Sequence, residues 1–509
     1  MTKLGKISIL FFFLAMTTAF CNGQKVQLIS PQREFRGAWI ATVANIDWPS
    51  RPGLSSESML KEIVSLLDKM QADGINAVIV QVRPTADAMY HSATEPWSQY
   101  ITGEQGKAPD RGFDPLAAFI GEAHKRHMEL HAWFNPFRVS NSAKSRLSQN
   151  NVARLHPEWT VSYDDKLYLD PGIPEVRSYL SKVIAEVVRN YDIDAIHFDD
   201  YFYPYKVEDK EFPDQNSFRK YKGQFVNRNE WRRANVDGII QNISNTIKNI
   251  KPWVKFGISP FGVWRNQSQD PRGSATRAGT TNYDDLYADV IKWQRLGWID
   301  YLLPQIYWEA GHPTVDFVTL ANWWAKNGYG RSVYIGHALY KVTPKVKGAW
   351  GNSSELTRQI RTVRKIEGLN GSAFYSAKHF SRDLMGFQDS LKKRLYKEPA
   401  LPPVMPWLDN TIPSSPLNLK IEKVKKGYHI EWEASVQNTP SKDPVAFIVY
   451  KNRKRGSIRK AQWISLSDKN DCFIARKFKI FRKKYEIRVT ALDRLHNESS
   501  PCLPVTIKL

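Results

Sequence analysis

The chain has 509 residues and a formal net charge of +22 at pH 7, a length that is too great for one small core and predicts two or three domains. Nucleic acid is the usual partner of so basic a chain, but no nucleic-acid-binding motif appears and the first residues predict export. An anionic cell wall or outer-membrane surface fits better, and solubility alone is the other explanation of the charge.

Residues 1–23 have the features of a secretory signal. Two lysines precede the apolar run 7–15, and small or polar residues follow it. This run is shorter than the ~20 apolar residues that a membrane-spanning helix needs. We therefore expect an exported protein in the periplasm or outside the cell. Cys21 stands where a lipoprotein signal carries its lipidated cysteine, but Phe20 before it is bulky, so an outer-membrane lipid anchor and simple cleavage near residue 23 both stay open.

From residue 31 to residue 395 the chain alternates apolar strand-like runs with amphipathic helix-like segments. The predicted strands are residues 35–41, 77–82, 129–134, 195–199, 254–259, 301–306, 333–337 and 371–375. The predicted helices are residues 58–72, 115–126, 174–190, 231–250, 283–296, 316–326, 355–366 and 384–394. Nearly continuous apolar strands are buried on both faces, as parallel strands are. Eight such units predict an α/β fold of the (β/α)8 TIM barrel class.

A doubly wound open sheet is the alternative arrangement of these elements. Such a sheet normally carries a glycine-rich phosphate-binding turn after its first strand. The corresponding residues 39–42 are Trp-Ile-Ala-Thr, which do not resemble that turn. The barrel is therefore the preferred prediction.

The sequence pattern changes after the barrel segment. Residues 396–412 form a proline-rich linker that can be neither helix nor central strand. Residues 413–509 contain short alternating strands, which predict a small all-β sandwich. We expect these strands at residues 417–422, 428–433, 446–450, 464–466 and 485–492. Trp432 and Tyr485 stand where a fibronectin type III domain has its core tryptophan and its corner tyrosine, so this segment resembles that domain.

The C-terminal region is also the most basic part of the chain. From Asp409 onward it holds 21 Lys and Arg residues against 10 Asp and Glu residues, a net charge of +11. Half of the net charge thus lies in a fifth of the chain, which is typical of a docking module more than of a catalytic one. Cys472 and Cys502 are the only cysteines after the signal segment, and a bridge between them and two free thiols are both compatible with the sequence.

Barrel enzymes carry their chemistry at the C-terminal ends of the strands. Here those ends are rich in aromatic and hydrogen-bonding side chains, which suit a sugar because rings cover its C–H faces and polar groups pair its hydroxyls. We expect substrate to be bound or oriented by Arg36, Trp39, Arg83, Asp87, Tyr90, Trp133, Asn135, Arg138, His197, Tyr201, Tyr203, Gln305, Tyr307, Trp308 and Tyr340. No Cys and His cluster has zinc spacing, so we predict no metal and no cofactor.

Hydrolysis of a glycosidic bond needs two carboxyl groups. The fifth, seventh and eighth strands carry none at their ends, which leaves Asp199 or Asp200 after the fourth strand and Glu309 after the sixth, with Asp87 as a more distant candidate. Adjacent strand residues point in opposite directions, so we expect Asp199 to face the barrel axis as the catalytic carboxylate, with Glu309 as its partner. Asp200 would orient Asp199 or contact substrate, and one carboxyl of an adjacent pair would have a raised pKa that suits an acid.

Both carboxylate assignments have structural alternatives. An adjacent pair of aspartates also serves to cap a helix or to bind a cation, and Glu309 is equally compatible with a solvated loop position. The sequence alone leaves these alternatives open.

Five stretches of the barrel segment resemble the glycosyl-hydrolase-like family ten. They are Glu34-Phe-Arg-Gly-Ala-Trp-Ile-Ala-Thr, Gly74-Ile-Asn-Ala-Val-Ile-Val-Gln-Val-Arg-Pro, His131-Ala-Trp-Phe-Asn-Pro-Phe-Arg, Ile196-His-Phe-Asp-Asp-Tyr-Phe-Tyr-Pro and Leu303-Pro-Gln-Ile-Tyr-Trp. The resemblance covers residues 31–395. It implies a TIM barrel, glycosidase activity and a link to the glycan of the bacterial cell wall, and a fibronectin-like tail is an addition found in some exported members.

Residues 193–199, Ile-Asp-Ala-Ile-His-Phe-Asp, also resemble the fourth-strand signature of chitinases, in which the acetamido group of the sugar takes part in catalysis. That signature ends with a glutamate where this chain has Tyr201, and His197 replaces an aspartate. A chitinase-type mechanism is therefore not implied, although an N-acetylated wall sugar remains a reasonable substrate.

The sequence thus predicts an exported glycoside hydrolase that acts on a bacterial polysaccharide, first of all on peptidoglycan glycan. The alternative outside catalysis is a glycan-binding or wall-tethering protein in which the barrel acts as a lectin. A polysaccharide deacetylase or lyase is the enzymatic alternative, and the lack of a His-x-x-x-His pair near the strand ends weighs against the deacetylase.

Overall fold

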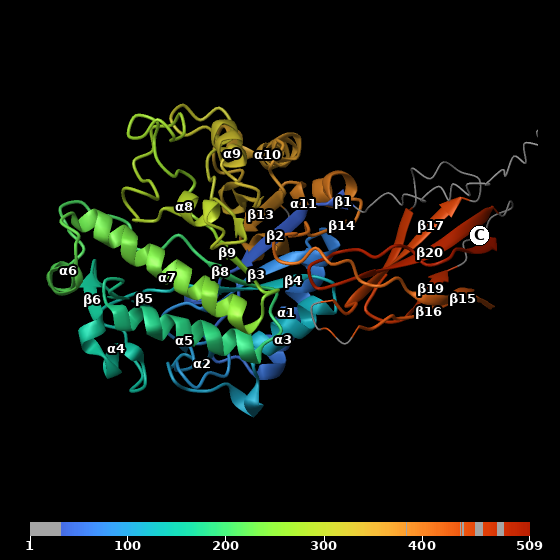
Figure 1. The fold of residues 1–509 in the computed structure, drawn as a ribbon, viewed down its shortest axis with the longest axis horizontal. Helices are drawn as coiled ribbons and strands as arrows, with labels where there is room; N and C mark the ends of the chain where they lie inside the picture. Colours follow the sequence, from blue (N-terminus) through green and yellow to red (C-terminus); the bar gives the residue numbers. More distant parts are fainter. Residues whose placement is uncertain are drawn as a thin grey trace, which may run out of the picture.

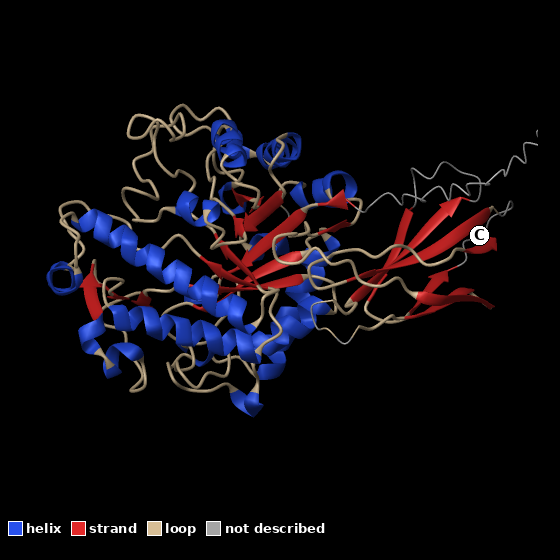
Figure 2. Ribbon diagram, viewed as in Figure 1, coloured by secondary structure: helices blue, strands red, loops and turns tan. Residues whose placement is uncertain are grey.

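The computed structural model describes residues 32–382, 384–437, 439, 442–453, 462–475 and 483–508. The predicted signal segment, residues 1–23, with Cys21, lies outside these residues. The described chain forms two units, of which one surrounds its strands with helices and the other contains only strands and loops (Figures 1 and 2). Among the described helices, none combines the length and the apolar character needed to span a bilayer.

The first unit is a closed parallel barrel. Its strands are β2 (Phe35–Ile40), β3 (Ala77–Arg83), β4 (Glu129–Phe134), β8 (Ala195–Phe198), β9 (Lys255–Ile258), β10 (Tyr301–Leu302), β11 (Ser332–Val333), β12 (Ile335–Ala338) and β13 (Gly371–Tyr375). They are joined in the order β11-β10-β9-β8-β4-β3-β2-β13-β12, with every neighbouring pair parallel. Since β11 and β12 are two halves of one strand interrupted at Tyr334, the barrel has eight strands, and the predicted TIM barrel is confirmed.

Helices surround the barrel. The main ones are α1 (Ser56–Ala72), α3 (Pro115–His124), α5 (Pro174–Asn190), α7 (Arg228–Ile250), α8 (Val290–Arg295), α9 (Phe317–Lys326), α10 (Ser354–Lys365) and α11 (Phe387–Ser390), which continues as a π turn over Leu391–Leu395. Shorter helices in the loops are α2 (Gln99–Thr102), α4 (Val152–Leu155) and α6 (Gln215–Tyr221). Helix starts follow local capping: Asp114 accepts a hydrogen bond from the Ala117 amide and precedes Pro115, which has no amide to leave unpaired.

Two of the predicted elements were too long. The predicted helix 283–296 forms only from Val290 to Arg295, because Asp289 caps it there through the Lys292 amide. The predicted strand 301–306 has regular pairing only at its first two residues, since Pro304 offers no amide to the ladder. The strand still continues to Gln305, which forms isolated parallel β-bridges with Phe261 and Gly336.

The barrel interior is filled by aromatic side chains. Phe35 and Tyr334 stack with ring centroids 4.1 Å apart. The hydroxyl of Tyr301 is hydrogen-bonded to ring nitrogens of His131 (2.7 Å) and His197 (2.9 Å). The Tyr301 ring lies directly over Gly257, where any Cβ would collide with it. The lower part of the barrel is therefore a packed core.

The second unit consists of two antiparallel sheets. One has the order β15-β16-β19 and the other β18-β17-β20-β21. The strands are β15 (Leu417–Val424), β16 (Gly427–Glu433), β17 (Ala446–Arg453), β18 (Gln462–Ser467), β19 (Asp471–Ala475), β20 (Lys484–Leu492) and β21 (Val505–Lys508). All five predicted strands are present, and β19 and β21 were missed. Trp432 is buried beside Phe447, and Cys472 and Cys502 are free thiols.

The two units meet at the N-terminal end of the barrel. Arg494 forms an ion pair with Asp192 (2.5 Å), and His496 contacts Glu129 (2.7 Å). The predicted linker crosses this end: β14 (Ala400–Leu401) pairs with β1 (Gln32–Arg33), and Trp407 donates to the Asp300 carboxylate (3.0 Å). The linker therefore closes the bottom of the barrel, opposite to the end where the strands finish.

Candidate active site

A pocket of about 300 Å³ lies at the C-terminal end of the barrel strands. It is lined by Trp39, Val43, Ile46, Gln81, Trp133, Arg138, Asp199, Asp200, Tyr201, Tyr205, Gln305, Tyr307, Tyr340 and Tyr375. Within the described part of the chain, Asp199 and Asp200 are the only carboxyl side chains of this lining. The pocket is thus where the barrel fold and the sequence both place the chemistry.

Both aspartates face this pocket, which differs from the predicted arrangement. The expectation that they point in opposite directions assumed that the strand continues through them. However, β8 ends at Phe198, and the chain turns immediately afterwards. The alternation of a strand therefore no longer applies, and the amide of Asp200 folds back to donate to Oδ1 of Asp199 (2.9 Å).

Asp199 is held by three donors. Besides the Asp200 amide, the Gln305 side-chain amide donates to Oδ1 (3.0 Å), and Asn135 donates to Oδ2 (3.3 Å). Gln305 is fixed in turn by a hydrogen bond to the Ser259 carbonyl (2.9 Å). These three hydrogen bonds fix the orientation of the Asp199 carboxyl group.

A chain of amides sets the orientation of Asn135. The amide groups of Thr42 and Val43 donate to Oε1 of Gln81 (3.0 and 2.9 Å), which fixes the direction of that side chain. The Gln81 nitrogen then donates to Oδ1 of Asn135 (2.5 Å), so that the Asn135 nitrogen points at Asp199. The position of Asp199 thus depends on residues at the ends of three neighbouring strands.

Asp200 has the opposite electrostatic character. It is 3% exposed, and its Oδ2 accepts a hydrogen bond from the hydroxyl of Tyr205. Burial, together with the charge of Asp199 and hydrogen bonding to it, raises the pKa of Asp200 well above the ordinary value of 3.8. A carboxyl group of this kind holds its proton at higher pH than an exposed aspartate does and is able to act as an acid.

Aromatic rings form the wall of the pocket. Tyr307 lies 6.0 Å from Tyr340 and 6.5 Å from Tyr375, measured between ring centroids. Trp133 is 4% exposed, and its Nε1 donor has no partner among the described residues. A sugar would find ring faces here, as saccharide recognition requires.

Nine predicted residues line the pocket, and a tenth, Asn135, contacts Asp199 from behind it. The nine are Trp39, Trp133, Arg138, Asp199, Asp200, Tyr201, Gln305, Tyr307 and Tyr340. The structure places the others elsewhere: Arg36, Arg83, Asp87, Tyr90, His197, Tyr203, Trp308 and Glu309 do not belong to the lining.

Arg36 and Arg83 each form a structural ion pair with a glutamate. Arg36 lies near the N-terminal end of β2, where Nε donates to Glu34 (2.7 Å) and a terminal nitrogen donates to the Glu398 carbonyl (2.9 Å). Arg83 is paired with Glu95 (2.6 Å) with neither side chain exposed, and it also donates to the Asn135 carbonyl (2.6 Å). Arg83 thus supports the strand that carries Asn135 without contacting the pocket.

Three further predicted residues are buried in the core. Burial raises the pKa of Asp87 to about 6, and its carboxylate accepts hydrogen bonds from Thr85 (3.1 Å) and Gln105 (3.2 Å). Tyr90 is fully buried and packs edge-on against Tyr191. His197 lies inside the barrel on Tyr301, where burial lowers its pKa well below 6.5. A position at or near a strand end was therefore not enough to predict that the side chain points into the pocket.

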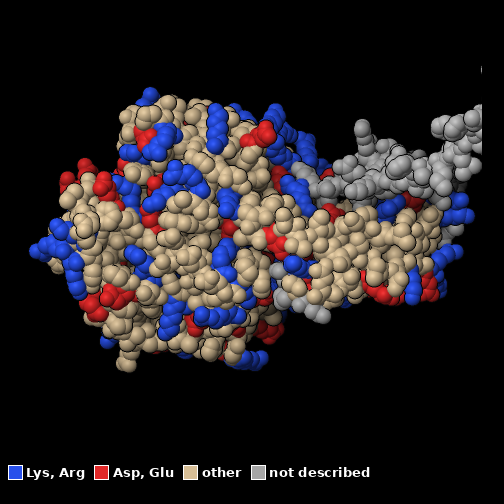
Figure 3. Space-filling view, viewed as in Figure 1, with Lys and Arg blue, Asp and Glu red and all other residues tan. Residues whose placement is uncertain are grey.

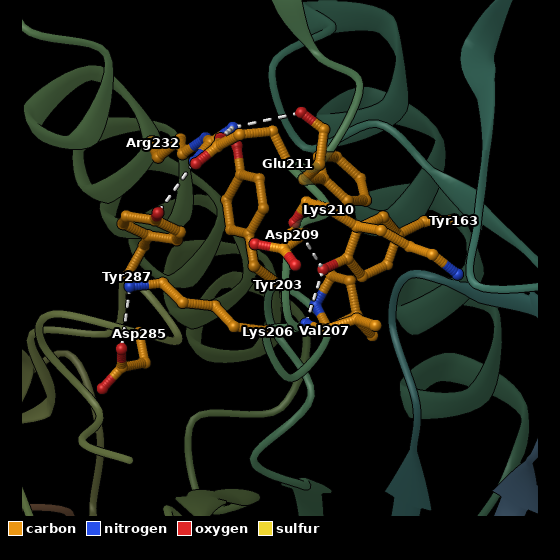
Figure 4. Close-up of a pocket in the computed structure, with 12 residues that line it drawn as sticks. Tyr163, Tyr203, Lys206, Val207, Asp209, Lys210, Glu211, Arg232, Asp285 and Tyr287 are labelled. Carbon is orange, nitrogen blue, oxygen red and sulfur yellow. Dashed lines mark hydrogen bonds and ion pairs between the residues drawn. The ribbon is translucent and has the colours of Figure 1, made fainter. Parts of the chain in front are cut away.

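Tyr203 lines a second pocket of about 360 Å³ on the other face of the loop that carries Asp200 (Figure 4). Two of the cations drawn there have polar partners within the pocket. Arg232 reaches Glu211 and the Tyr287 hydroxyl, and Lys206 reaches Asp285 (2.8 Å). Tyr203 itself is 1% exposed. This pocket therefore offers a ligand no open ring face from Tyr203.

Glu309, the predicted partner of Asp199, lies outside the pocket. Its carboxylate accepts a hydrogen bond from Nε1 of Trp350 (2.9 Å). Burial acts to raise the pKa of Glu309, but hydrogen bonds outweigh it and leave the pKa lowered. Trp308 packs edge-on against Phe261 (5.6 Å). The chain turns away from the barrel axis after Tyr307, and proximity in sequence to that pocket residue was therefore misleading.

Five lining residues were missing from the prediction, namely Val43, Ile46, Gln81, Tyr205 and Tyr375. Gln81 and Tyr375 stand near strand ends but were not assigned to the site. Gln81 could have been selected by the same argument as Gln305, because both are glutamines near the end of a barrel strand. Tyr205 lies seven residues after the end of β8 and enters the pocket because the loop folds back. No strand-end rule would have selected it.

Comparisons with known proteins find similar sequences among the glycosyl hydrolases. A family model described as Glycosyl hydrolase-like 10 matches residues 34–351. The chain is similar to Glycosyl hydrolase YngK of Bacillus subtilis (strain 168), with 47% identity over 474 residues that cover 92% of each protein. It is also similar to Glycosyl hydrolase DigH of Escherichia coli (strain K12), with 40% identity over 371 residues, 68% of this chain and 84% of that protein.

Solved structures are similar at lower identity. The PgaB (BpsB) glycoside hydrolase domain from Bordetella bronchiseptica is 12% identical with a TM-score of 0.45, over 71% of this chain and 99% of that one. Alpha-L-fucosidase isoenzyme 2 from Paenibacillus thiaminolyticus is 13% identical with a TM-score of 0.43, over 76% of this chain and 52% of that one.

Proposed function

The chain belongs to the glycosyl hydrolase-like 10 family and is a glycoside hydrolase, and we propose that it cleaves the glycan strands of bacterial peptidoglycan outside the cytoplasm. The observation that carries the proposal is the Asp199–Asp200 pair at the bottom of a pocket walled by tyrosine and tryptophan rings. Such a pocket suits a pyranose chain, and the pair supplies both an acid and an anion.

In this proposal Asp200 is the proton donor. Its raised pKa keeps it protonated, and the Tyr205 hydroxyl fixes the orientation of its carboxyl group. The proton passes to the oxygen of the leaving sugar as the bond from that oxygen to the anomeric carbon breaks. The sequence had left open which carboxyl of the pair would have the raised pKa, and this proposal assigns the role of acid to Asp200.

Asp199 and Asp200 are too close to act from opposite sides of the scissile bond. The two carboxyl groups interact directly, whereas a nucleophile and an acid of a retaining glycosidase lie about 5 Å apart. A nucleophile from the substrate solves this: the acetamido oxygen of an N-acetylated sugar bonds to the anomeric carbon as the leaving group departs. Asp199 accepts a hydrogen bond from the acetamido N–H. In a second step water attacks the anomeric carbon and gives a proton to the Asp200 carboxylate, and the bond from that carbon to the acetamido oxygen breaks. Glu309 has no part in this mechanism.

The experiment is to incubate the purified protein with N-acetylated wall glycan and with several exopolysaccharides and to measure new reducing ends. New ends from wall glycan, absent with Asp200→Asn, are the expected result. Products with an unsaturated or anhydro end would point to a lyase. If no polysaccharide yields new ends, the proposed substrate class is wrong.

For the C-terminal unit we propose a fibronectin type III-like domain that binds the anionic cell envelope. The two antiparallel sheets and the buried Trp432 support the domain type. On the face drawn in Figure 3, basic and acidic side chains are interspersed, and much of the basic charge lies in residues 454–460 and 476–482, outside the described part.

Replacing the lysines and arginines of residues 454–460 by glutamine tests this proposal. Less of the variant should sediment with anionic wall material in low salt. If equal amounts of variant and wild type sediment, the charge has a solubility role only.

Export is the remaining part of the proposal and depends on residues 1–23. Expression of the full chain in a bacterial host should place the protein beyond the inner membrane. Replacement of Cys21 by alanine separates the two routes, because it would release a lipid-anchored protein into the soluble fraction and would leave a simply cleaved protein unchanged. Retention of the full chain in the cytoplasm would contradict export.

A further inference from the structure

The pocket around Asp199 and Asp200 contains a single cation. Among its lining residues in the described chain, Arg138 is the only lysine, arginine or histidine. It is the first residue of β5 (Arg138–Ser140), which leaves the end of β4 toward a small sheet with β7 (Lys166–Leu169) and β6 (Thr160–Tyr163). The guanidinium therefore approaches the pocket from above the barrel rim.

The protein fixes one side of this guanidinium and leaves the other side free. Nε donates to the carbonyl of Pro84 (3.0 Å), and the group lies over the ring of Tyr201 at 5.4 Å from its centroid. The terminal nitrogens have no hydrogen-bond partner among the described residues, and no described carboxylate lies within ion-pair distance. Arg138 is only half-buried and thus stays accessible from the pocket.

Other arginines near the barrel rim show that this is a distinctive arrangement. Arg83 is paired with Glu95 (2.6 Å), and Arg232 is paired with Asp214 (2.7 Å). Arg265 is likewise paired with Asp284 (2.9 Å). A partly desolvated cation without an anion is unfavourable in the free protein, and a ligand anion offsets that cost.

We infer that Arg138 binds a carboxylate of the substrate and thereby selects an acidic sugar. The two terminal nitrogens form one edge of a planar fork, which matches the two oxygens of a carboxylate. In the proposed substrate this group is the lactyl carboxylate of N-acetylmuramic acid, so the inference rests on the proposed function. Arg138 acts on specificity, whereas Asp199 and Asp200 act on the bond.

The test compares two forms of one substrate. Glycan strands with free lactyl carboxylates are prepared, and a part of them is reduced so that each carboxylate becomes an alcohol. For the wild-type protein, kcat/KM should fall about 10–100-fold on the reduced strands, which is the range of a charge-assisted bidentate contact. In Arg138→Gln the ratio between the two substrates should fall toward one, and Arg138→Lys should retain part of the preference.

The outcomes separate this inference from the proposed function. Equal hydrolysis of native and reduced strands by the wild-type protein would overturn the role of Arg138 and leave the proposed function standing. No hydrolysis of either form would overturn the proposed function itself. The wild-type comparison does not depend on the folding of a variant. An independent measurement is binding to inactive Asp200→Asn: a muramic-acid oligosaccharide should bind more tightly than a chitin oligosaccharide of the same length, and equal affinities would count against a carboxylate contact.

Discussion

The two ends of the barrel each contain a buried carboxyl cluster, and the two clusters are built in opposite ways. At the N-terminal end, Glu129 accepts hydrogen bonds from Lys255, His131 and His496. At the C-terminal end, Asp200 lies beside Asp199 and accepts a hydrogen bond from the Tyr205 hydroxyl. Glu129 thus has a lysine and two histidines as its partners, whereas Asp200 has a second carboxyl group as its neighbour.

The pKa values follow these surroundings. Burial alone would raise the pKa of Glu129, but the charge of Lys255 and the hydrogen bonds of His131 and His496 hold it well below 4.5. Burial and the charge of Asp199 raise the pKa of Asp200. A buried carboxylate with cationic partners is stabilised as an ion and supports the fold, whereas a buried carboxyl without them keeps its proton for chemistry. Burial by itself does not distinguish the two roles.

The largest expected effect is that of Asp200→Asn on activity. Asparagine keeps the shape of the carboxyl group but has no acidic proton to transfer to the leaving group, so we expect kcat to fall by about 10²–10⁴. Asparagine is neutral and can be buried beside Asp199 without ionising, so the variant should be as stable as the wild type at pH 7, or more stable. Reducing-end assays and thermal melts measure the two quantities. A variant that is inactive because it is unfolded would not support this assignment.

The matching change at the other end is Glu129→Gln, which should act on stability. It leaves Lys255 buried without its anion, and removing one partner of a buried ion pair costs about 3–5 kcal/mol. Denaturant unfolding measures this loss of unfolding free energy. The kcat of the folded fraction should remain within twofold of the wild type. A loss of kcat as large as that of Asp200→Asn would remove the contrast between the two ends.

The two clusters should also respond oppositely to pH. Asp200 has a raised folded pKa, so its favourable contribution to the folded state is present near pH 3.8 and is lost as pH rises through the raised value. Glu129 has a lowered folded pKa, so its contribution is present above pH 4.5 and is lost as pH falls toward that lowered value. Unfolding free energies of the wild type, Asp200→Asn and Glu129→Gln across pH test this. Activity should decline with rising pH as Asp200 loses its proton.

The sequence predicted the barrel well because parallel strands have a strong signature. The apolar run of β3 and the length of α5 left little ambiguity, and both match the structure at the residue level apart from one strand residue. The second sheet was less accessible. β19 (Asp471–Ala475) is short and half-exposed, so its pattern is weak, and its place depends on pairing with β16.

The site was predicted in composition more than in geometry. Strand ends identified Asp199, Gln305 and Tyr307, because the backbone of a barrel places them at one rim. They could not identify the direction of a side chain once the strand had ended, which is why Glu309 was chosen and Tyr205 was missed. Loop conformation depends on contacts between distant segments, and a strand-by-strand inspection of the sequence does not contain them.

A smaller effect is expected from Tyr205→Phe. The variant loses the hydrogen bond to Asp200, which lowers the pKa of that carboxyl group in the wild type. We expect kcat to fall about five- to tenfold, since the net contribution of a single hydrogen bond is about 1 kcal/mol. The pH above which activity is lost should also move upward. A pH profile of kcat separates this from a packing defect, which would lower kcat without moving the profile.

The smallest expected effect is that of Glu309→Gln. Its carboxylate accepts a hydrogen bond from Trp350 outside the pocket, and glutamine retains an oxygen that accepts the same bond. The change should therefore alter kcat by less than about threefold, as for a partly exposed side chain that is not in contact with substrate. The assay is the one used for Asp200→Asn, on the same glycan and at the same pH. A fall of the size seen with Asp200→Asn would mean that the loop after Tyr307 closes on the bound glycan and brings Glu309 to the scissile bond. In that case the two aspartates would act together as one catalytic carboxyl group, the second group would come from the sixth strand, and the substrate would not need an acetamido group.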